Sequence, residues 1–334
     1  MKLRTFLACS AIIFFMLTLS VCNRSGSDPV LPEPEAQAVS SDILSVNPDA
    51  DSDLLSVVFS YQGESRSVSG QRLDSSTWLF NAGAGKKIRL ATLDWPPYIG
   101  QQLRGQGWVQ QVTVALLASR GYELKISYFP WARAVSLVEN GEYDILYPEY
   151  YIAPQEPSDF IQNTRRLDHL ELSEELPGGP VALVKRRDFA FEFSGDLREL
   201  HGLRIGVVQG YQNTPEFDAR MAAGAFVISY AVDDFQNAQK LFYGRIDILV
   251  GDPLVITHSI LASDLSRDEK NDMLQELEPV YPILQENSLY YAVSTRNSAW
   301  QSLLADLNQA IAEFKASGEL NRLIADFSPA APVD

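Results

Sequence analysis

The pattern of apolar and polar residues becomes regular after Lys86 and predicts a layered α/β fold. Lys87 to Leu93 alternates and then turns apolar, which is typical of a strand that opens a core. Trp108 to Ser119 carries apolar residues at helical spacing and ends before Arg120-Gly121, a common helix C-terminus. The same unit continues as strand, helix and strand at Leu124 to Phe129, Ala132 to Glu139 and Tyr143 to Tyr147. Elements that alternate in this way form a parallel sheet covered by helices.

A second unit repeats this layout. Its helices are expected at Pro215 to Ala222, where Asn213 or Thr214 would cap the N-terminus, and at Asp234 to Tyr243. Its strands are expected at Gly179 to Lys185, Leu203 to Val208, Ala225 to Ala231 and Ile246 to Val250. The chain then returns through a strand at Tyr290 to Ser294 to helices between Leu303 and Phe327.

The first residues are typical of an exported protein. Lys2 and Arg4 precede an uncharged apolar run, Phe6 to Val21, which is shorter than the roughly 20 residues that a membrane span needs. The run ends in Leu19-Ser20-Val21-Cys22, which resembles the lipobox of bacterial lipoproteins, although Val21 departs from the usual small residue. We expect a signal peptide at 1–22 with lipidation at Cys22. An ordinarily cleaved signal peptide and an uncleaved anchor are the alternatives.

Residues 23–86 separate this segment from the regular part. Asn23 to Gln37 is rich in Ser, Pro, Gly and Glu and predicts a tether that leads away from a membrane. Leu54 to Tyr61 has the content of a strand and is followed by a turn-like Gln62-Gly63-Glu64. This part is either a small hairpin or a loosely docked arm.

Composition and charge narrow the function classes. The apolar fraction is 46% and the charged fraction 21%, as in globular proteins. The formal net charge of −16, without a basic run, argues against nucleic acid as a partner. The 2 cysteines, Cys9 and Cys22, both lie in the export segment, so we expect no disulfide or thiolate metal site in the folded body. His169, His201 and His258 show no metal-ligand spacing, and we expect no metal and no cofactor.

The order of motifs resembles the family 3 periplasmic solute-binding proteins, the amino-acid-type receptors of ABC importers. The residues that carry the resemblance are Ile88 to Tyr98, Gly105 to Gly121, Asn140 to Asp144, Leu172 to Lys185, Leu200 to Gly210, Gly244 to Asp252 and Trp300 to Phe327. The resemblance implies a two-lobed, type II periplasmic-binding-protein-like α/β fold, in which each lobe is a mixed, mostly parallel sheet flanked by helices. Two crossing strands, near Gly179 to Arg187 and Ile283 to Ser294, would join the lobes. The first lobe would comprise 87–184 and 283–328, the second 185–282, and 329–334 would be a tail.

The resemblance also implies a function. A periplasmic, monomeric receptor, held on the membrane by its lipid, would capture a small polar solute such as an amino acid or a related amine or carboxylate. Hinge closure would bury the solute between the lobes, and the receptor would deliver it to an ABC permease in the inner membrane. Such a receptor needs no catalytic residue.

Ligand contacts in the first lobe are expected where strands give way to loops. Aromatic rings there could form an apolar or cation–π wall, and an arginine could hold an anion. The candidates are Trp95, Tyr98, Trp131, Arg133, Tyr147, Glu149 and Tyr150. Each has a structural alternative, such as core packing for Trp95 or a surface ion pair for Arg133.

In amino-acid binders of the family, a Thr-x-x-Arg step then supplies the arginine that holds the ligand carboxylate. Here Ile152 to Glu156 contains no arginine, and Arg166, or Arg165, could fill the role from a displaced position; two solvated arginines are the alternative. The second lobe offers Gln209, Gly210, Tyr211 and Asn213 before a helix N-terminus, which favours anions, or plain loop and cap chemistry. Asp252 matches the family's acid for the ligand's amino group, or else caps a helix.

Two other function classes remain open. Some relatives on this fold are dehydratases, in which case Glu149 or Asp252 could act as a general acid in an apolar cleft. A sensory receptor for a membrane partner is the third class, and the sequence does not separate it from a transport receptor.

Overall fold

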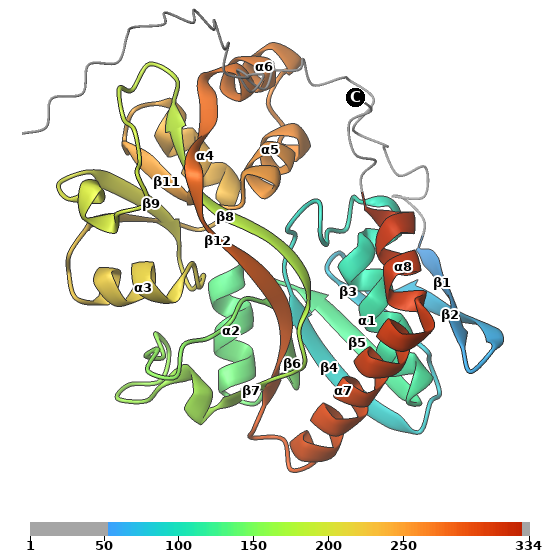
Figure 1. Ribbon diagram of the computed structural model, residues 1–334. Helices are drawn as coiled ribbons and strands as arrows, with labels where there is room; N and C mark the ends of the chain where they lie inside the picture. Colours follow the sequence, from blue (N-terminus) through green and yellow to red (C-terminus); the bar gives the residue numbers. More distant parts are fainter. Residues whose placement is uncertain (1–52, 329–334) are drawn as a thin grey trace, which may run out of the picture. The chain divides into compact units, whose positions relative to one another are not determined.

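The computed structural model describes residues 53–328 (Figure 1). All described residues belong to one compact unit. The predicted signal peptide with Cys22, the tether and the tail at 329–334 lie outside the described residues. Within the described part, no helix has the length and apolar character needed to cross a membrane.

The first sheet is mixed and is built around a parallel centre. Its strands run in the order β1-β2-β3-β5-β4-β6-β12, and β4 pairs in parallel with both β5 and β6. The bounds are β1 Leu54–Tyr61, β2 Glu64–Arg72, β3 Thr77–Phe80, β4 Lys86–Thr92, β5 Tyr122–Tyr128 and β6 Ile145–Glu149. Its helices are α1 Trp108–Ser119, α2 Trp131–Glu139, α7 Trp300–Ser317 and α8 Glu319–Phe327.

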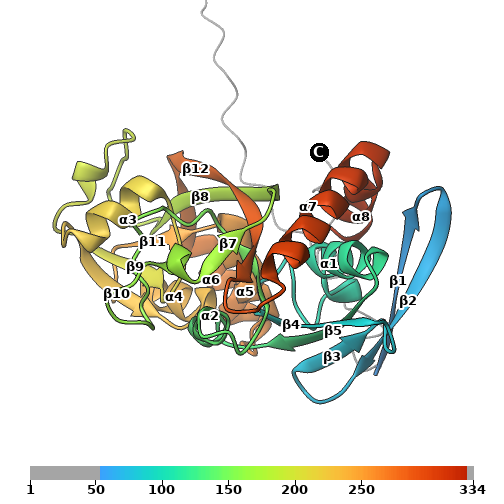
Figure 2. The ribbon, with the colours of Figure 1, turned by 90° about the horizontal axis from the view of Figure 1, so that it is seen from below.

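The segment after the predicted tether forms a hairpin that docks on helices. β1 and β2 pair antiparallel through a turn in which Gln62 and Gly63 take positive φ values of 53° and 80°. Phe59 buries its ring 5.9 Å from the ring of Phe314 in α7. The Ser60 N–H donates to the Glu319 carboxylate at the start of α8 (2.7 Å). The hairpin therefore lies against α7 and α8, as Figure 2 shows, and α8 satisfies part of its free edge.

The second sheet follows the order β12-β8-β11-β9-β10, in which β9 pairs in parallel with β10 and β11. Its strands are β8 Leu176–Arg186, β9 Arg204–Val208, β10 Val227–Ala231 and β11 Ile248–Gly251. Its helices are α3 Pro215–Ala222, α4 Asp234–Phe242, α5 Pro253–Ala262 and α6 Arg267–Glu276.

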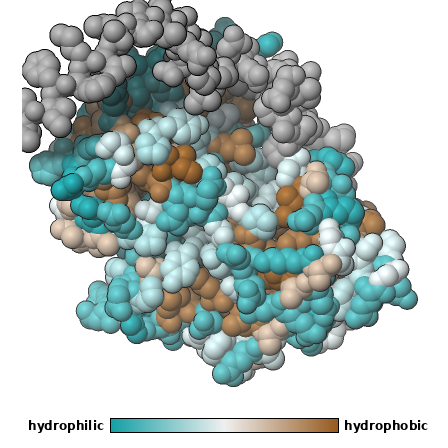
Figure 3. All heavy atoms as spheres, viewed as in Figure 1, coloured by the Kyte–Doolittle hydropathy of each residue, from teal (hydrophilic) through white to brown (hydrophobic). Residues whose placement is uncertain are grey.

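Single-turn helices lie at Arg104–Gln106, Arg166–Asp168 and Leu197–Leu200, and a short strand, β7, at Leu170–Leu172. On the face in Figure 3, hydrophilic side chains surround smaller apolar areas.

Two long antiparallel strands connect the sheets. β12, Leu277–Ser294, pairs with β8 along most of its length and with β6 and β7 near its end. The apolar pattern predicted only Tyr290 to Ser294 of this strand, because Pro279, Pro282 and several charged residues interrupt it before that point, and the family resemblance implied a crossing near Ile283 to Ser294. The predicted α/β fold, with mixed sheets flanked by helices, is confirmed.

Among the strands that begin later than the sequence predicted, β6 and β11 do so for the same reason. Asp144 precedes β6, and its carboxylate accepts the Arg89 N–H of β4 at 2.8 Å. Asp247 precedes β11, and its carboxylate accepts the Arg204 N–H of β9 at 2.8 Å. Each aspartate thus ties the entry of one strand to its parallel neighbour, and the regular ladder begins only after it.

Candidate ligand pocket

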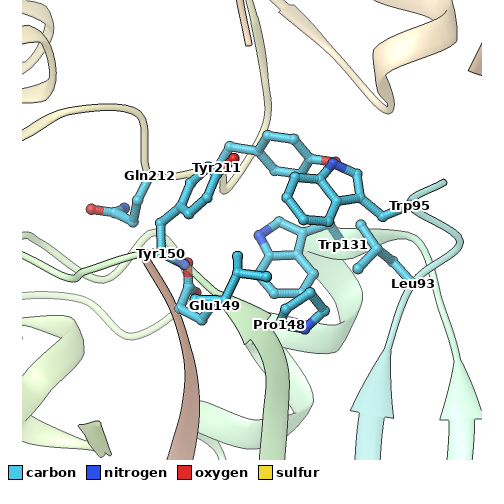
Figure 4. Close-up of a pocket in the computed structure, with 9 residues that line it drawn as sticks. Leu93, Trp95, Trp131, Pro148, Glu149, Tyr150, Tyr211 and Gln212 are labelled. Carbon is cyan, nitrogen blue, oxygen red and sulfur yellow. The ribbon is translucent and has the colours of Figure 1, made fainter. Parts of the chain in front are cut away.

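A pocket lies between residues of the first sheet and residues of the second (Figure 4). It encloses about 270 Å³ of space, which includes its opening to solvent. Its lining comprises Leu93, Trp95, Trp131, Pro148, Glu149, Tyr150, Tyr211, Gln212 and Leu289.

The strand topology explains why these residues meet. The loops after β4, β6 and β9 supply Trp95, Tyr150 and Tyr211, and Trp131 opens α2 just after β5. In an open α/β sheet the carboxyl ends of parallel strands meet along one edge, and ligands bind there. The two sheets present such edges to each other, so the pocket takes residues from both.

Four aromatic rings form two nearly perpendicular pairs around the pocket. The rings of Trp95 and Tyr150 lie 5.7 Å apart at 78°, and those of Trp131 and Tyr211 lie 6.1 Å apart at 87°. The Trp131 indole N–H donates to the Gly210 carbonyl at 2.9 Å, which ties α2 to the loop after β9. Gly210 has a φ of 81°, which glycine adopts without strain.

A second direct bond joins the two sheets beside the pocket. Tyr98, whose ring stacks on Trp95 at 4.6 Å, donates its hydroxyl proton to Asp252 Oδ2 at 2.7 Å. Asp252 Oδ1 accepts the Leu254 N–H at 2.8 Å, so Asp252 also caps α5. Burial raises the pKa of the Asp252 carboxyl, and burial beside that carboxylate raises the pKa of Tyr98. Both oxygens of the expected ligand-binding acid thus already bond to the protein.

This contact depends on a glycine in β8. A Cβ atom on Gly179 would lie 2.0 Å from the Tyr98 hydroxyl oxygen and 2.7 Å from Asp252 Oδ2. Such distances are well below van der Waals contact, so only glycine lets these two side chains meet over the connecting strand.

Arg166 belongs to a buried ion triad behind the pocket. Its Nε donates to Glu139 at 2.9 Å and its Nη2 to Glu149 Oε2 at 2.8 Å, while the Tyr150 N–H donates to Glu149 Oε1. The three side chains are at most 4% exposed. Burial raises the pKa of Glu149, and the Arg166 charge opposes that shift. Arg166 therefore pairs with carboxylates of the protein itself. Arg165 is exposed and pairs with Asp168.

The structure places the other predicted residues away from the pocket lining. Tyr147 is fully buried and its hydroxyl donates to Gln110 at 2.7 Å in the core. Asn213 is held by Asp218 through its N–H and its side-chain amide. Arg133 is exposed above the Phe129 ring, and Gln209 is exposed.

Sequence reasoning missed several residues of this region. Leu93, Pro148, Gln212 and Leu289 line the pocket, although the first three adjoin predicted contacts. Asp234 was assigned only to a helix start, yet its carboxylate accepts the Tyr211 hydroxyl proton at 2.8 Å. Burial raises the pKa of Asp234 to about 7. The sequence did hold a signal for this role, since two successive aspartates, Asp233 and Asp234, stand at the N-terminus of α4. Asp233 alone caps the helix, so the carboxylate of Asp234 is free for another partner.

The sequence matches no protein-family model and no curated protein. Solved structures do match. One is a histidine kinase sensor domain with similarity to periplasmic binding proteins, at 18% identity over 72% of this chain and 95% of that chain, with a TM-score of 0.55.

The chain has the fold of the periplasmic binding proteins. An ancestral arginine-binding protein, solved with arginine bound, is 18% identical over 72% of this chain and 97% of its own, with a TM-score of 0.54. An arginine transport periplasmic binding protein from Legionella pneumophila is 14% identical over 73% of this chain and 100% of its own, with a TM-score of 0.53. The predicted two-lobed fold is thereby confirmed: the first sheet with its helices forms the first lobe, and the second sheet with its helices forms the second.

Proposed function

We propose that the protein is an extracytoplasmic solute-binding receptor that captures a small polar solute between its two lobes. The observation that carries the proposal is the aromatic pocket, to which both sheets contribute. A site divided in this way is completed only when the lobes close, so closure and ligand binding stabilise each other.

The connection between the lobes supports a hinge. The two lobes are joined by the paired strands β8 and β12, whose register shifts between Val280 and Gln285 and again between Asn287 and Leu289. The direct bonds from Tyr98 to Asp252 and from Trp131 to Gly210 describe a closed arrangement. Breaking these few contacts and bending the strand pair would open the pocket.

We also propose that the receptor is lipidated at Cys22, resides in the periplasm and delivers its solute to an ABC importer. Structural relatives in amino acid transport support the delivery step. Lipidation has a direct test, because Cys22→Ala should move the protein from the membrane fraction to the soluble fraction. Retention of the variant on the membrane would overturn this assignment.

A thermal-shift screen of the purified protein tests the receptor itself. Amino acids, amines, organic acids and sugars would be added one class at a time. A ligand at 100 times its dissociation constant should stabilise the fold by about 2.7 kcal/mol. A flat response to all four classes would refute the receptor.

A sensory role is the second candidate, and one observation favours it. A histidine kinase sensor domain matches this chain as well as the transport proteins do, at a TM-score of 0.55. Crosslinking in membranes separates the two roles. A transport receptor should be captured with a permease, and a sensor should be captured with a signalling protein.

The geometry gives less support to an enzyme. Glu149 and Asp252, the residues that could act as general acids, each have both oxygens engaged by protein groups. The structural relatives named above are binding or sensor proteins. Recovery of an unchanged ligand after prolonged binding would agree with a receptor.

A further inference from the structure

The pocket wall is dominated by aromatic rings that face it from different directions. Trp95, Trp131, Tyr150 and Tyr211 come from both lobes, and each ring lies almost perpendicular to its partner (Figure 4). The face of an aromatic ring carries partial negative charge and attracts a cation within about 6 Å. Rings on several sides can surround one cationic group.

The ionisable groups next to the pocket are mainly acidic, which favours a cation over an anion. Glu149 lines it, and Asp234 accepts the hydroxyl proton of the lining residue Tyr211. Glu149 is paired with the Arg166 guanidinium, and the same guanidinium is also paired with Glu139. No positively charged side chain is among the lining residues. A ligand carboxylate would therefore find no lysine or arginine in the lining and would depend on neutral hydrogen-bond donors.

The hydrogen-bond capacity of the lining distinguishes between kinds of cation. A buried primary ammonium needs acceptors for three N–H donors. Here each Glu149 oxygen already accepts a bond, from the Arg166 guanidinium and from the Tyr150 N–H, which leaves few free acceptors in the lining. The remaining lining residues Leu93, Pro148 and Leu289 offer apolar side chains. A methylated ammonium needs no acceptors and presents methyl groups to such a wall.

Two buried donors in the lining are unused. The Trp95 indole N–H and the Tyr150 hydroxyl have no hydrogen-bond partner among the described residues. Both residues are buried, with Trp95 6% and Tyr150 8% exposed. Leaving such groups unpaired costs free energy, so an oxygen on the ligand would be stabilised beside them.

We propose that the pocket binds a small methylated ammonium compound that also carries a hydroxyl or carboxylate oxygen. This inference rests on the proposed receptor function and names its ligand class. The four rings would enclose the ammonium group. The Trp95 N–H and the Tyr150 hydroxyl would donate to the oxygen.

Isothermal titration calorimetry with matched probes tests the ligand class. Choline and glycine betaine are the methylated probes, and L-arginine, L-lysine and L-glutamate represent amino acids. The uncharged carbon isostere of choline, 3,3-dimethylbutan-1-ol, has the same shape without the positive charge. We expect at least one methylated probe to bind, and the isostere to bind about 10-fold to 30-fold more weakly than choline, as the loss of a desolvated cation–π contact predicts.

Variants assign the binding to the rings. Trp131→Leu should weaken binding of the methylated probe about 10-fold to 30-fold, whereas Tyr230→Leu, at a residue that is 57% exposed and outside the lining, should leave it unchanged. Trp95→Phe keeps a ring and removes the unused donor. It should weaken each methylated probe that binds severalfold, with little change in melting temperature if the ring packs as before.

The outcomes separate this inference from the receptor function. Binding of an amino acid without binding of either methylated probe would overturn the ligand class and leave the receptor standing. Equal affinity for choline and its isostere would also overturn it, because the charge would then contribute nothing. If no solute of any class binds, the receptor function itself fails.

Discussion

Asp234 makes the stability of the protein depend on pH in a direction opposite to that of most carboxylates. Burial raises its pKa to about 7, against 3.8 for the ordinary group. Asp218, which is also buried, has a pKa raised to about 7 by burial. Between pH 3.8 and about pH 7, the folded state holds the carboxyl proton of each group more tightly than the unfolded chain does. Stability is therefore greatest at the acidic end and is lost as the pH rises through 7.

The magnitude follows from the pKa. One pKa unit corresponds to about 1.4 kcal/mol, and pH 5.5 lies about 1.5 units below the folded-state pKa of each group. Lowering the pH from 8 to 5.5 should therefore raise the free energy of unfolding by about 2 kcal/mol for Asp234 and by about as much for Asp218.

Urea unfolding at several pH values between 5.5 and 8 measures this gain. Asp234→Asn keeps an oxygen for the Tyr211 hydroxyl and removes the titration, so about 2 kcal/mol of the gain should disappear. Asp233→Asn is the neighbouring control, because it changes an exposed carboxylate and asparagine still caps the helix. Most of the gain should remain in this variant, slightly reduced because the Asp233 charge helps to raise the pKa of Asp234. If Asp234→Asn gained as much stability on acidification as the wild type, Asp234 would not be titrating in this range.

Two further predictions concern the closed arrangement and the ion triad. Gly179→Ala should break the hydrogen bond between Tyr98 and Asp252, which is worth about 1.5–3 kcal/mol as a bond to a charged group. Without this bond the protein should open, and X-ray scattering should show a larger radius of gyration. An unchanged radius would contradict the role of the contact in closure. Arg166→Met leaves two buried carboxylates unpaired and should lower the free energy of unfolding by about 3–5 kcal/mol, whereas the exposed Arg165→Met should cost at most about 1 kcal/mol. Equal losses in urea unfolding would disprove the triad's burial.

The sequence was sufficient to predict the alternation of strands and helices, because local periodicity determines it. Helix α3 matches its expected bounds, Pro215–Ala222, and Thr214 caps it through the Phe217 N–H. The crossing strand β12 was predicted only in part. Its remaining residues pair with β8, far away in the sequence, and this pairing rather than apolar alternation keeps them extended.

The sequence identified the loops of the site better than the roles of single residues. Trp95, Trp131, Glu149, Tyr150 and Tyr211 do line the pocket, since each follows or begins an element at the edge of a sheet. What a side chain bonds to depends on contacts between distant segments, which a single sequence does not reveal. The roles expected from the family resemblance therefore remain predictions.

Arg166 shows how a departure from a family pattern changes the chemistry of a site. The family's arginine would offer a free guanidinium to a ligand carboxylate. Here the guanidinium faces Glu139 and Glu149, and its Nη1 has no partner among the described residues. One arginine thus pairs with two carboxyl groups of the protein instead of with a ligand carboxylate. The same residue type that would select an anion elsewhere thus holds Glu149 in place at a pocket that suits a cation.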